Sequence, residues 1–229
     1  MTSGEPIGRT ALDKIIGRWP GPNRKRHRFV SEADEPPRLW DHLPRSLITF
    51  AGVKLFRRYK RGLPWLPYAA IEWIEQHIDK QTRVLEFGAG NSSIFFARRV
   101  HSVTSVEASA EWCSRVEEEL REEGLNNVRI ITVLPTDVLA KIQDGSIPVA
   151  EHDFVLLDAT PREVILEPII SRLGAKSFLA VDNWDRYHYA EFRQRGCPKP
   201  EIEFTDFAPY NFSVSSLAIF RDQGESRTQ

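Results

Sequence analysis

Residues 84–100 read VLEFGAGNSSIFFARRV, and this stretch decides the fold. An apolar run with the character of a buried strand leads into Glu86, and two glycines one residue apart follow shortly after it. Residues 92–100 then have the pattern of a helix. A glycine-rich turn between a strand and a helix is typical of nucleotide sites in several enzyme classes. The residues around Gly88 and Gly90 therefore have to distinguish these classes.

The turn does not match a dinucleotide fingerprint, because Ser93 stands where G-x-G-x-x-G requires a third glycine. Glu86 would repel a pyrophosphate across a dry cleft, whereas it would attract a ligand with an amino group or a cationic centre. A second acid, Glu107, ends the next apolar run 21 residues later. An acid at such a strand end can accept hydrogen bonds from both ribose hydroxyls. The pattern therefore predicts a nucleoside ligand with a positively charged tail.

Strands and helices alternate along the rest of the chain. Apolar runs predict seven strands, at 83–87, 103–107, 128–133, 153–158, 176–182, 201–207 and 213–222. Helices are expected at 68–78, 92–100, 109–124, 163–173 and 187–195. This alternation predicts an α/β fold, a Rossmann-like and mostly parallel seven-stranded sheet with helices on both faces. The last two strands have no helix between them, which predicts an antiparallel C-terminal edge.

The first part of the chain differs from the rest in charge. Residues 1–65 hold 14 Lys or Arg against 6 Asp or Glu, a net charge of +8, whereas residues 66–229 have a net charge of −9. We therefore divide the chain into a basic N-terminal extension, 1–65, and a second domain, 66–229. Within the extension, residues 41–61 predict an amphipathic helix among basic side chains. The apolar members of its stripe are Leu47, Ile48, Ala51, Leu55 and Tyr59.

This basic helix allows two interpretations. We favour a helix that packs on the domain and leaves its basic residues in water, and the alternative is a helix that contacts a membrane surface or an acidic partner.

The two cysteines, Cys113 and Cys197, have no paired spacing, so we expect structural thiols and a reducing compartment. With no signal-peptide pattern at the start, we expect a cytoplasmic protein, membrane-peripheral if the helix contacts lipid. The acidic domain lacks a basic and aromatic groove, so we expect no nucleic acid partner.

VLEFGAGNSS resembles the first motif of the class I S-adenosylmethionine-dependent methyltransferases, and the resemblance extends roughly from Tyr68 to Asp222. It implies S-adenosyl-L-methionine as cofactor and methyl transfer to a small-molecule acceptor, with oxygen as the favoured acceptor atom. Methylation at nitrogen or of a membrane-associated head group, and a catalytically silent partner subunit, remain open. The cofactor-binding residues that the resemblance implies are Glu86, Gly88, Ala89, Gly90, Asn91, Ser92, Glu107, Ala108 and Asp158.

Two later segments resemble a group of bacterial class I methyltransferases with D-x-x-P-R and D-N-x-D-R-x-x-Y motifs. Here the motifs begin at Asp158 and at Asp182, each directly after a predicted strand. This resemblance places four residues on the acceptor side: Arg162, Asp185, Arg186 and Tyr189. His188 lies beside them and is a candidate general base, since the unperturbed pKa of histidine is about 6.5. The catalytic candidates are Asp158, Asp182 and His188.

A more distant resemblance links the same strand ends to the catechol and caffeoyl-CoA type O-methyltransferases. Those enzymes bind a metal ion through an Asp after the fourth strand and an Asp-Asn pair after the fifth, so Asp158, Asp182 and Asn183 are candidate metal ligands. They also carry a lysine base three residues after the first Asp, and Pro161 stands at that position here. A divalent metal is therefore possible, and the interpretation that we favour has none.

Overall fold

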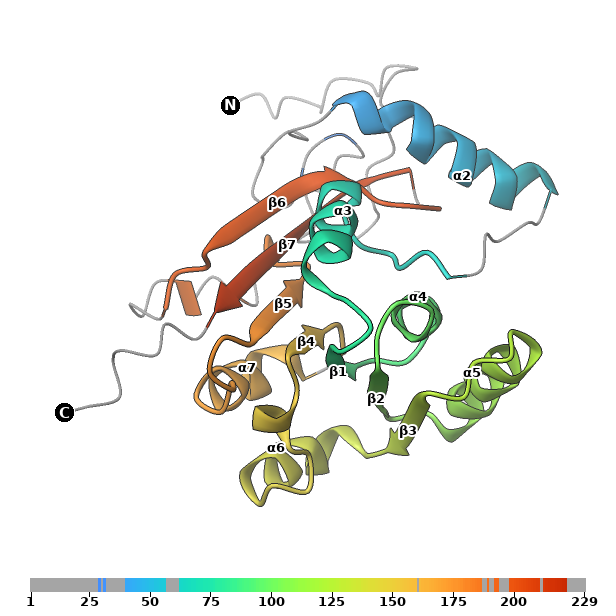
Figure 1. Cartoon of the computed structure of the whole chain (residues 1–229). Coiled ribbons are helices and arrows are strands. Elements are labelled where there is room, and N and C mark those ends of the chain that lie inside the picture. Colours follow the sequence, from blue (N-terminus) through green and yellow to red (C-terminus); the bar gives the residue numbers. More distant parts are fainter. Residues whose placement is uncertain are drawn as a thin grey trace, which may run out of the picture.

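The computed structural model describes residues 29, 31, 40–56, 62–159, 161–186, 189, 192–193, 198–210 and 212–221. Its strands form one seven-stranded sheet in the order β3-β2-β1-β4-β5-β7-β6 (Figure 1). The strands are β1 (Arg83–Phe87), β2 (Ser102–Glu107), β3 (Val128–Thr132), β4 (Phe154–Leu157), β5 (Phe178–Asp182), β6 (Ile202–Phe207) and β7 (Val214–Arg221). Strand β7 runs antiparallel to β5 and β6, and the other neighbouring pairs are parallel. The predicted sheet and its antiparallel C-terminal edge are confirmed.

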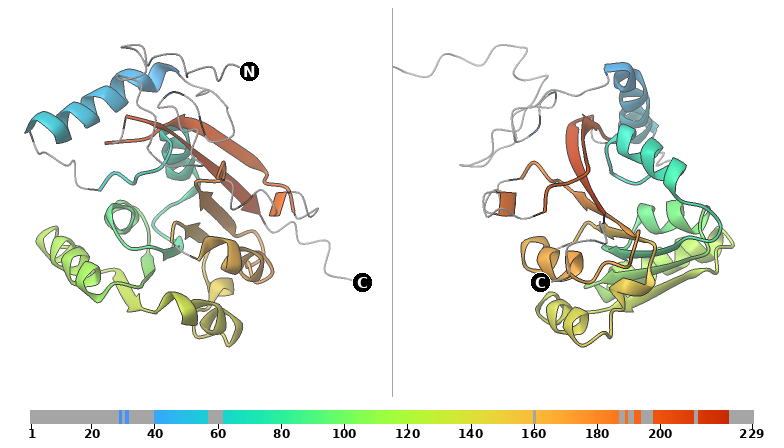
Figure 2. Two further views of the ribbon diagram at one scale, coloured as in Figure 1. Left: turned by 180° about the vertical axis from the view of Figure 1, so that it is seen from behind. Right: turned by 60° about the vertical axis from the view of Figure 1, so that its left-hand side comes forward.

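Helices cover both faces of this sheet, as the views in Figures 1 and 2 show together. One apolar cluster joins the sheet to α3 (Tyr68–His77), α4 (Asn91–Ala97) and α5 (Ala110–Glu122). The other joins it to α6 (Pro135–Gln143) and α7 (Arg162–Ile170). Successive side chains of a strand point to opposite faces, so Val84 belongs to the first cluster and Leu85 to the second.

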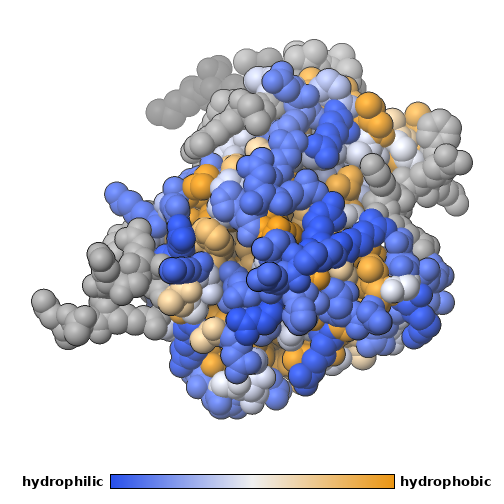
Figure 3. All heavy atoms as spheres, in the orientation of Figure 1, coloured by the Kyte–Doolittle hydropathy of each residue, from blue (hydrophilic) through white to orange (hydrophobic). Residues whose placement is uncertain are grey.

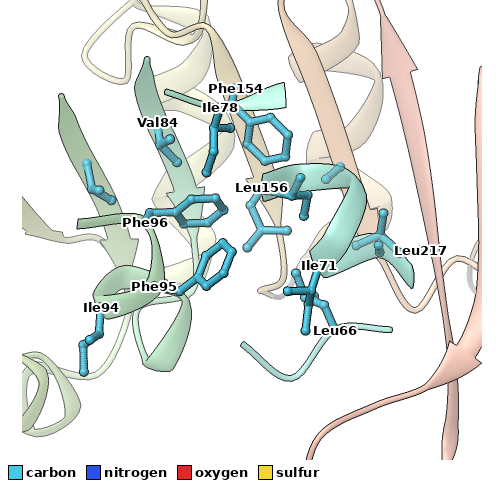
Figure 4. Packing of buried hydrophobic residues seen from close by; sticks show 14 of the residues in the cluster. Leu66, Ile71, Ile78, Val84, Ile94, Phe95, Phe96, Phe154, Leu156 and Leu217 are labelled. Carbon is cyan, nitrogen blue, oxygen red and sulfur yellow. The ribbon is translucent and has the colours of Figure 1, made fainter. Parts of the chain in front are cut away.

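Aromatic side chains of α4 fill the centre of the first cluster. Phe95 and Phe96 are fully buried, and the ring of Phe96 lies 5.7 Å from that of Phe154 on β4. Figure 4 shows both rings among Val84 of β1, Leu156 of β4 and the other labelled side chains. Burying a ring of this size contributes about 1.5–3 kcal/mol. This packing holds α4 against the sheet and thereby fixes the glycine turn that precedes it.

Local sequence signals account for most of the helix boundaries. The Ser109 side chain caps α5 by accepting a hydrogen bond from the backbone of Trp112, 3.2 Å, and Gly124 adopts a left-handed φ of 69° just after the helix. Helix α6 was not predicted, although Pro135 at its first turn and the buried pair Val138 and Ile142 are typical helix signals. The helix predicted at 187–195 falls mostly outside the described residues.

The predicted N-terminal helix exists, but its apolar stripe does not face the domain. A short 3₁₀ turn, η1 (Trp40–His42), leads into α2 (Leu43–Phe56). Three of the residues expected to be buried are instead exposed, namely Leu47 (42%), Ile48 (72%) and Leu55 (73%). The remaining stripe residue outside α2, Tyr59, is not described. The opposite face of the helix makes the contacts with the domain, so the predicted orientation of the stripe is wrong.

Polar contacts attach α2 to the end of β6 and to the start of α3. The hydroxyl of Ser46 donates to the backbone oxygen of Ala208, 3.2 Å, and Thr49 hydrogen-bonds the Tyr68 hydroxyl, 3.1 Å. His42 pairs with the fully buried carboxylate of Asp206. Burial raises the pKa of Asp206, and the hydrogen bond from His42 opposes that rise. Because several buried groups would lose their partners if α2 detached, we regard this helix as an integral part of the fold.

Candidate functional site

The turn after β1 is held so close to β4 that only glycine fits at its first position. Gly88 has a φ of 102°, and a Cβ placed on it would lie 2.8 Å from the backbone oxygen of Asp158. Its N–H donates to the backbone oxygen of Val106, 2.8 Å. A Cβ on Gly90, in contrast, would meet nothing within 4 Å. The turn therefore has free space beside Gly90, which we call the open cradle, and a close backbone contact at Gly88 that excludes any side chain.

Glu86 lies beneath this turn, and not on its outer side as the sequence analysis expected. It shares the face of β1 that carries Val84, so its side chain points toward α4 and is fully buried. The hydroxyl of Ser105 donates to its carboxylate, 2.5 Å, and the hydroxyl of Ser93 donates to the same oxygen. Burial raises the pKa of Glu86 to about 7. Its contacts are those of a residue that supports the turn from behind.

The raised pKa of Glu86 predicts a pH dependence of folding. Its proton is held to about pH 7 in the folded state and released near pH 4.5 in the unfolded state. The free energy of unfolding should therefore fall by about 3 kcal/mol as pH rises through this interval. In Glu86→Gln this part of the decrease should be absent in urea unfolding at pH 5, 6, 7 and 8. Glu111→Gln, at an exposed position of α5, is the control, and an unchanged slope in Glu86→Gln would contradict the assignment.

Glu107 ends β2 and faces the same turn from the other side. One carboxylate oxygen accepts from the backbone N–H groups of Ala108, 2.7 Å, and Ser109, 3.0 Å, and the other accepts from Ala89, 3.2 Å. These contacts fix the carboxylate at the strand end and leave acceptor capacity for hydroxyl groups of a ligand. The indole N–H of Trp112 donates to the backbone oxygen of Ala89, 2.7 Å, and holds the turn against α5.

A cavity of about 930 Å³ opens beside these groups, at the carboxyl ends of β1, β2 and β4. Open α/β sheets bind their ligands at this edge, and the volume is in the range of small-molecule sites. The predicted site residues on its wall are Gly88, Ala89, Gly90, Asn91, Ser92, Glu107, Ala108, Asp158, Arg162, Arg186 and Tyr189. Those that are described but lie off the wall are Glu86, Asp182, Asn183 and Asp185. His188 lies outside the described residues.

Part of the cavity wall was not predicted from the sequence. Trp112, Arg115 and Glu119 face the cavity from α5, and Trp65 faces it from the segment before α3. Trp112 could have been recognised, because a tryptophan in the first turn after the cap at Ser109 must lie near the end of β2. Trp65 carries no comparable signal, since its position depends on how the N-terminal segment folds onto the domain.

Arg162 links the two aspartates that the sequence analysis expected to meet. Its guanidinium forms an ion pair with Asp158 on the cavity wall, donates to the backbone oxygen of Asp182, 3.1 Å, and lies 3.5 Å from the Asp182 carboxylate. Burial and the neighbouring Asp158 raise the pKa of Asp182 well above its usual value, so Asp182 gains a proton more readily than an exposed carboxyl does.

These contacts do not fit a divalent metal ion at Asp158, Asp182 and Asn183. A side-chain cation, Arg162, already contacts both carboxyls, and the Asn183 amide donates to Asp182. In the described part of the chain, no three His, Cys, Asp or Glu side chains are arranged to hold a metal. Pro161, the position of the expected lysine base, is the N-cap of α7. The contacts of Asp158 and Asp182 are therefore those of an ion-pair network around Arg162.

The sheet order and the site edge define the fold of the class I S-adenosylmethionine-dependent methyltransferases. No family model and no curated protein matches the chain. Solved structures do match. An O-methyltransferase from Bacillus cereus in complex with SAH is 16% identical, with a TM-score of 0.55 over 78% of this chain and 90% of that one. An rRNA methylase from Streptococcus thermophilus is 13% identical, with a TM-score of 0.51 over 67% of this chain and 94% of that one. At these identities the likeness shows the fold.

Proposed function

We propose that this protein transfers a methyl group from S-adenosyl-L-methionine to an oxygen of a small-molecule acceptor. The observation that carries the proposal is a cavity whose wall joins the glycine turn and Glu107 to Asp158 and Arg162. The demethylated cofactor bound to the Bacillus cereus O-methyltransferase supports this choice of ligand. In this proposal residues 66–229 form the catalytic domain and residues 1–65 form an extension that contributes Pro64 and Trp65 to the wall.

The two strand ends would hold different parts of the cofactor. Glu107 would accept hydrogen bonds from the ribose hydroxyls, and the open cradle at Gly90 would receive the methionine part without a side chain in its way. Glu86 would act indirectly, by holding Ser93 at the start of α4. When bound, the cofactor supplies an electrophilic methyl group on a sulfonium centre.

The chain's own residues would then position the acceptor and take its proton. Methyl transfer is a displacement that depends mainly on alignment of the reacting atoms. Arg162, Arg186 and Tyr189 line the side of the cavity next to Asp158. Asp158 is the carboxyl of the pair that lies on the cavity wall, so it is the candidate base. Asp182 lies off the wall and would influence the charge of Asp158 through the Arg162 guanidinium that both carboxyls contact. His188 remains a second candidate base from the sequence.

Cofactor identity is testable by calorimetry. We expect the protein to bind S-adenosylhomocysteine and not NAD. Glu107→Ala should weaken that binding by about 10- to 100-fold, the usual effect of leaving hydroxyl groups of a ligand unpaired. Glu111→Ala, at an exposed position on α5, is the matched control and should bind as the parent does. Binding of NAD in preference to S-adenosylhomocysteine would contradict the proposal.

Metal dependence of the reaction is a separate expectation. Because Arg162 already occupies the position between Asp158 and Asp182 that a metal ion would take, activity on phenolic, sugar or carboxylate acceptors should be the same with and without EDTA. The panel also separates acceptor atoms, if amines are included beside the oxygen acceptors. Activity that is lost on chelation and restored by Mg²⁺ would contradict the metal-free proposal.

A further inference from the structure

The exposed face of α2 is the part of the molecule that the methyltransferase fold does not explain. Leu47, Ile48 and Leu55 lie within one stripe of the helix, because residues seven and eight apart return to the same side after two turns. All three are at least 42% exposed. Figure 3 shows hydrophobic residues in orange at the upper right, where Figure 1 places α2. From Leu47 to Leu55 the stripe is about 12 Å long.

The stripe cannot turn inward, because the opposite face of α2 is already attached to the domain. His42 pairs with buried Asp206, and Ser46 is buried with its hydroxyl on the backbone of Ala208. Rotating the helix to bury Ile48 would expose Ser46 and leave Asp206 without His42. The apolar stripe is therefore presented outward by the fold.

Basic residues flank the stripe and continue beyond it. On the helical wheel, Lys54 lies next to Leu47 on one side, and Arg45, which forms a half-exposed ion pair with Glu72, borders Ile48 on the other. The sequence directly after α2, residues 57–61, reads RRYKR, and residues 1–65 together carry a net charge of +8. An apolar stripe between basic borders is the composition of helices that lie in the plane of a membrane interface. A negatively charged surface complements this charge, whereas a second copy of the same basic helix would repel it.

We propose that α2 docks this protein on an anionic lipid surface, with Leu47, Ile48 and Leu55 in the interface. The segment that follows α2 leads to Pro64 and Trp65, which line the cavity. Pro64 lies eight residues after the end of α2 in the sequence, so the docking helix and this wall of the cavity are joined by a short segment. This proposal is independent of the cofactor, because no residue of the stripe lines the cavity.

The test is flotation of the full-length protein with vesicles, without any cofactor. The parent should bind vesicles of three parts phosphatidylcholine and one part phosphatidylglycerol, bind phosphatidylcholine alone weakly, and be released by 0.5 M NaCl. The double variant Ile48→Ser/Leu55→Ser should bind the mixed vesicles about tenfold more weakly, because two apolar side chains no longer enter the interface. Val164→Ser, which removes an exposed apolar side chain from α7 (46% exposed), is the matched control and should bind as the parent does.

Three outcomes would overturn the proposal. The parent fails to float with the mixed vesicles at low salt, or the double variant floats as well as the parent. The third is a parent that is dimeric by light scattering without lipid while the double variant is monomeric, which would assign the stripe to a second copy of the chain. Circular dichroism of the double variant should match that of the parent, since both substituted side chains are exposed.

Discussion

Gly88→Ala is expected to lower the free energy of unfolding by about 2–5 kcal/mol and to abolish binding of S-adenosylhomocysteine. The φ of 102° at this position strains any other residue, at a cost of about 1–3 kcal/mol. The added Cβ would also lie 2.8 Å from the backbone oxygen of Asp158. Relieving that contact requires the turn and the end of β4 to separate, which deforms the cavity wall. Urea unfolding and calorimetric titration measure the two effects.

Gly90→Ala is the matched comparison, because it adds the same methyl group two residues later. Its Cβ would meet no atom within 4 Å, so the loss of stability should be limited to the effect of Ala at the N-cap of α4, about 1 kcal/mol, and stay below that of Gly88→Ala. The methyl group would enter the open cradle, and ligand affinity should therefore fall although the fold is retained. If Gly88→Ala is as stable as the parent, the close approach of β1 and β4 is not a requirement of the fold.

The fold was predictable because its signals are local. The strand at Val84 and the helix between Ser109 and Gly124 carry apolar periodicity and caps that hold in any tertiary context. The meeting of Asp158 with Asp182 also followed from the rule that neighbouring parallel strands end at one edge. The contact of Arg162 with both carboxyls could not be predicted from the sequence, since it depends on how close the start of α7 lies to the end of β4.

Two predictions were wrong, the position of Glu86 beside the turn and the burial of the stripe on α2, and both errors have one physical cause. A periodic pattern defines which residues share a face of a strand or helix, but not what packs against that face. Glu86 lies on the same face of β1 as Val84, and only the position of α4 shows that this face is dry. The stripe of Leu47 and Ile48 was recognised correctly as a stripe, yet its burial was assumed. Whether such a face meets the core or another surface is decided by tertiary contacts, here those of His42 and Ser46.

Arg162→Met is expected to lower the free energy of unfolding by about 3–5 kcal/mol at pH 8, the usual effect of removing one partner from a buried ion pair. The guanidinium contacts both Asp158 and Asp182 and, together with Arg186, lowers the pKa of each. Without it, the pKa of both carboxyls rises further, so the folded variant binds more protons than the unfolded chain. Its stability should therefore fall more steeply with rising pH than that of the parent, and the loss should be smaller at pH 5. Urea unfolding at both pH values measures this difference.

A second substitution tests whether the loss arises from the carboxyls. In Arg162→Met/Asp182→Asn the neutral amide at position 182 needs no cation beside it, so much of the stability at pH 8 should return. Arg162→Lys keeps the charge but cannot reach Asp158 and Asp182 together, and should fall between the parent and Arg162→Met. An Arg162→Met loss that is equal at pH 5 and pH 8, and that Asp182→Asn leaves unchanged, would mean that Arg162 acts through its packing. The carboxyl pair would then hold its charge without this arginine, and the proposed assignment of Asp158 as the base would lose its electrostatic support.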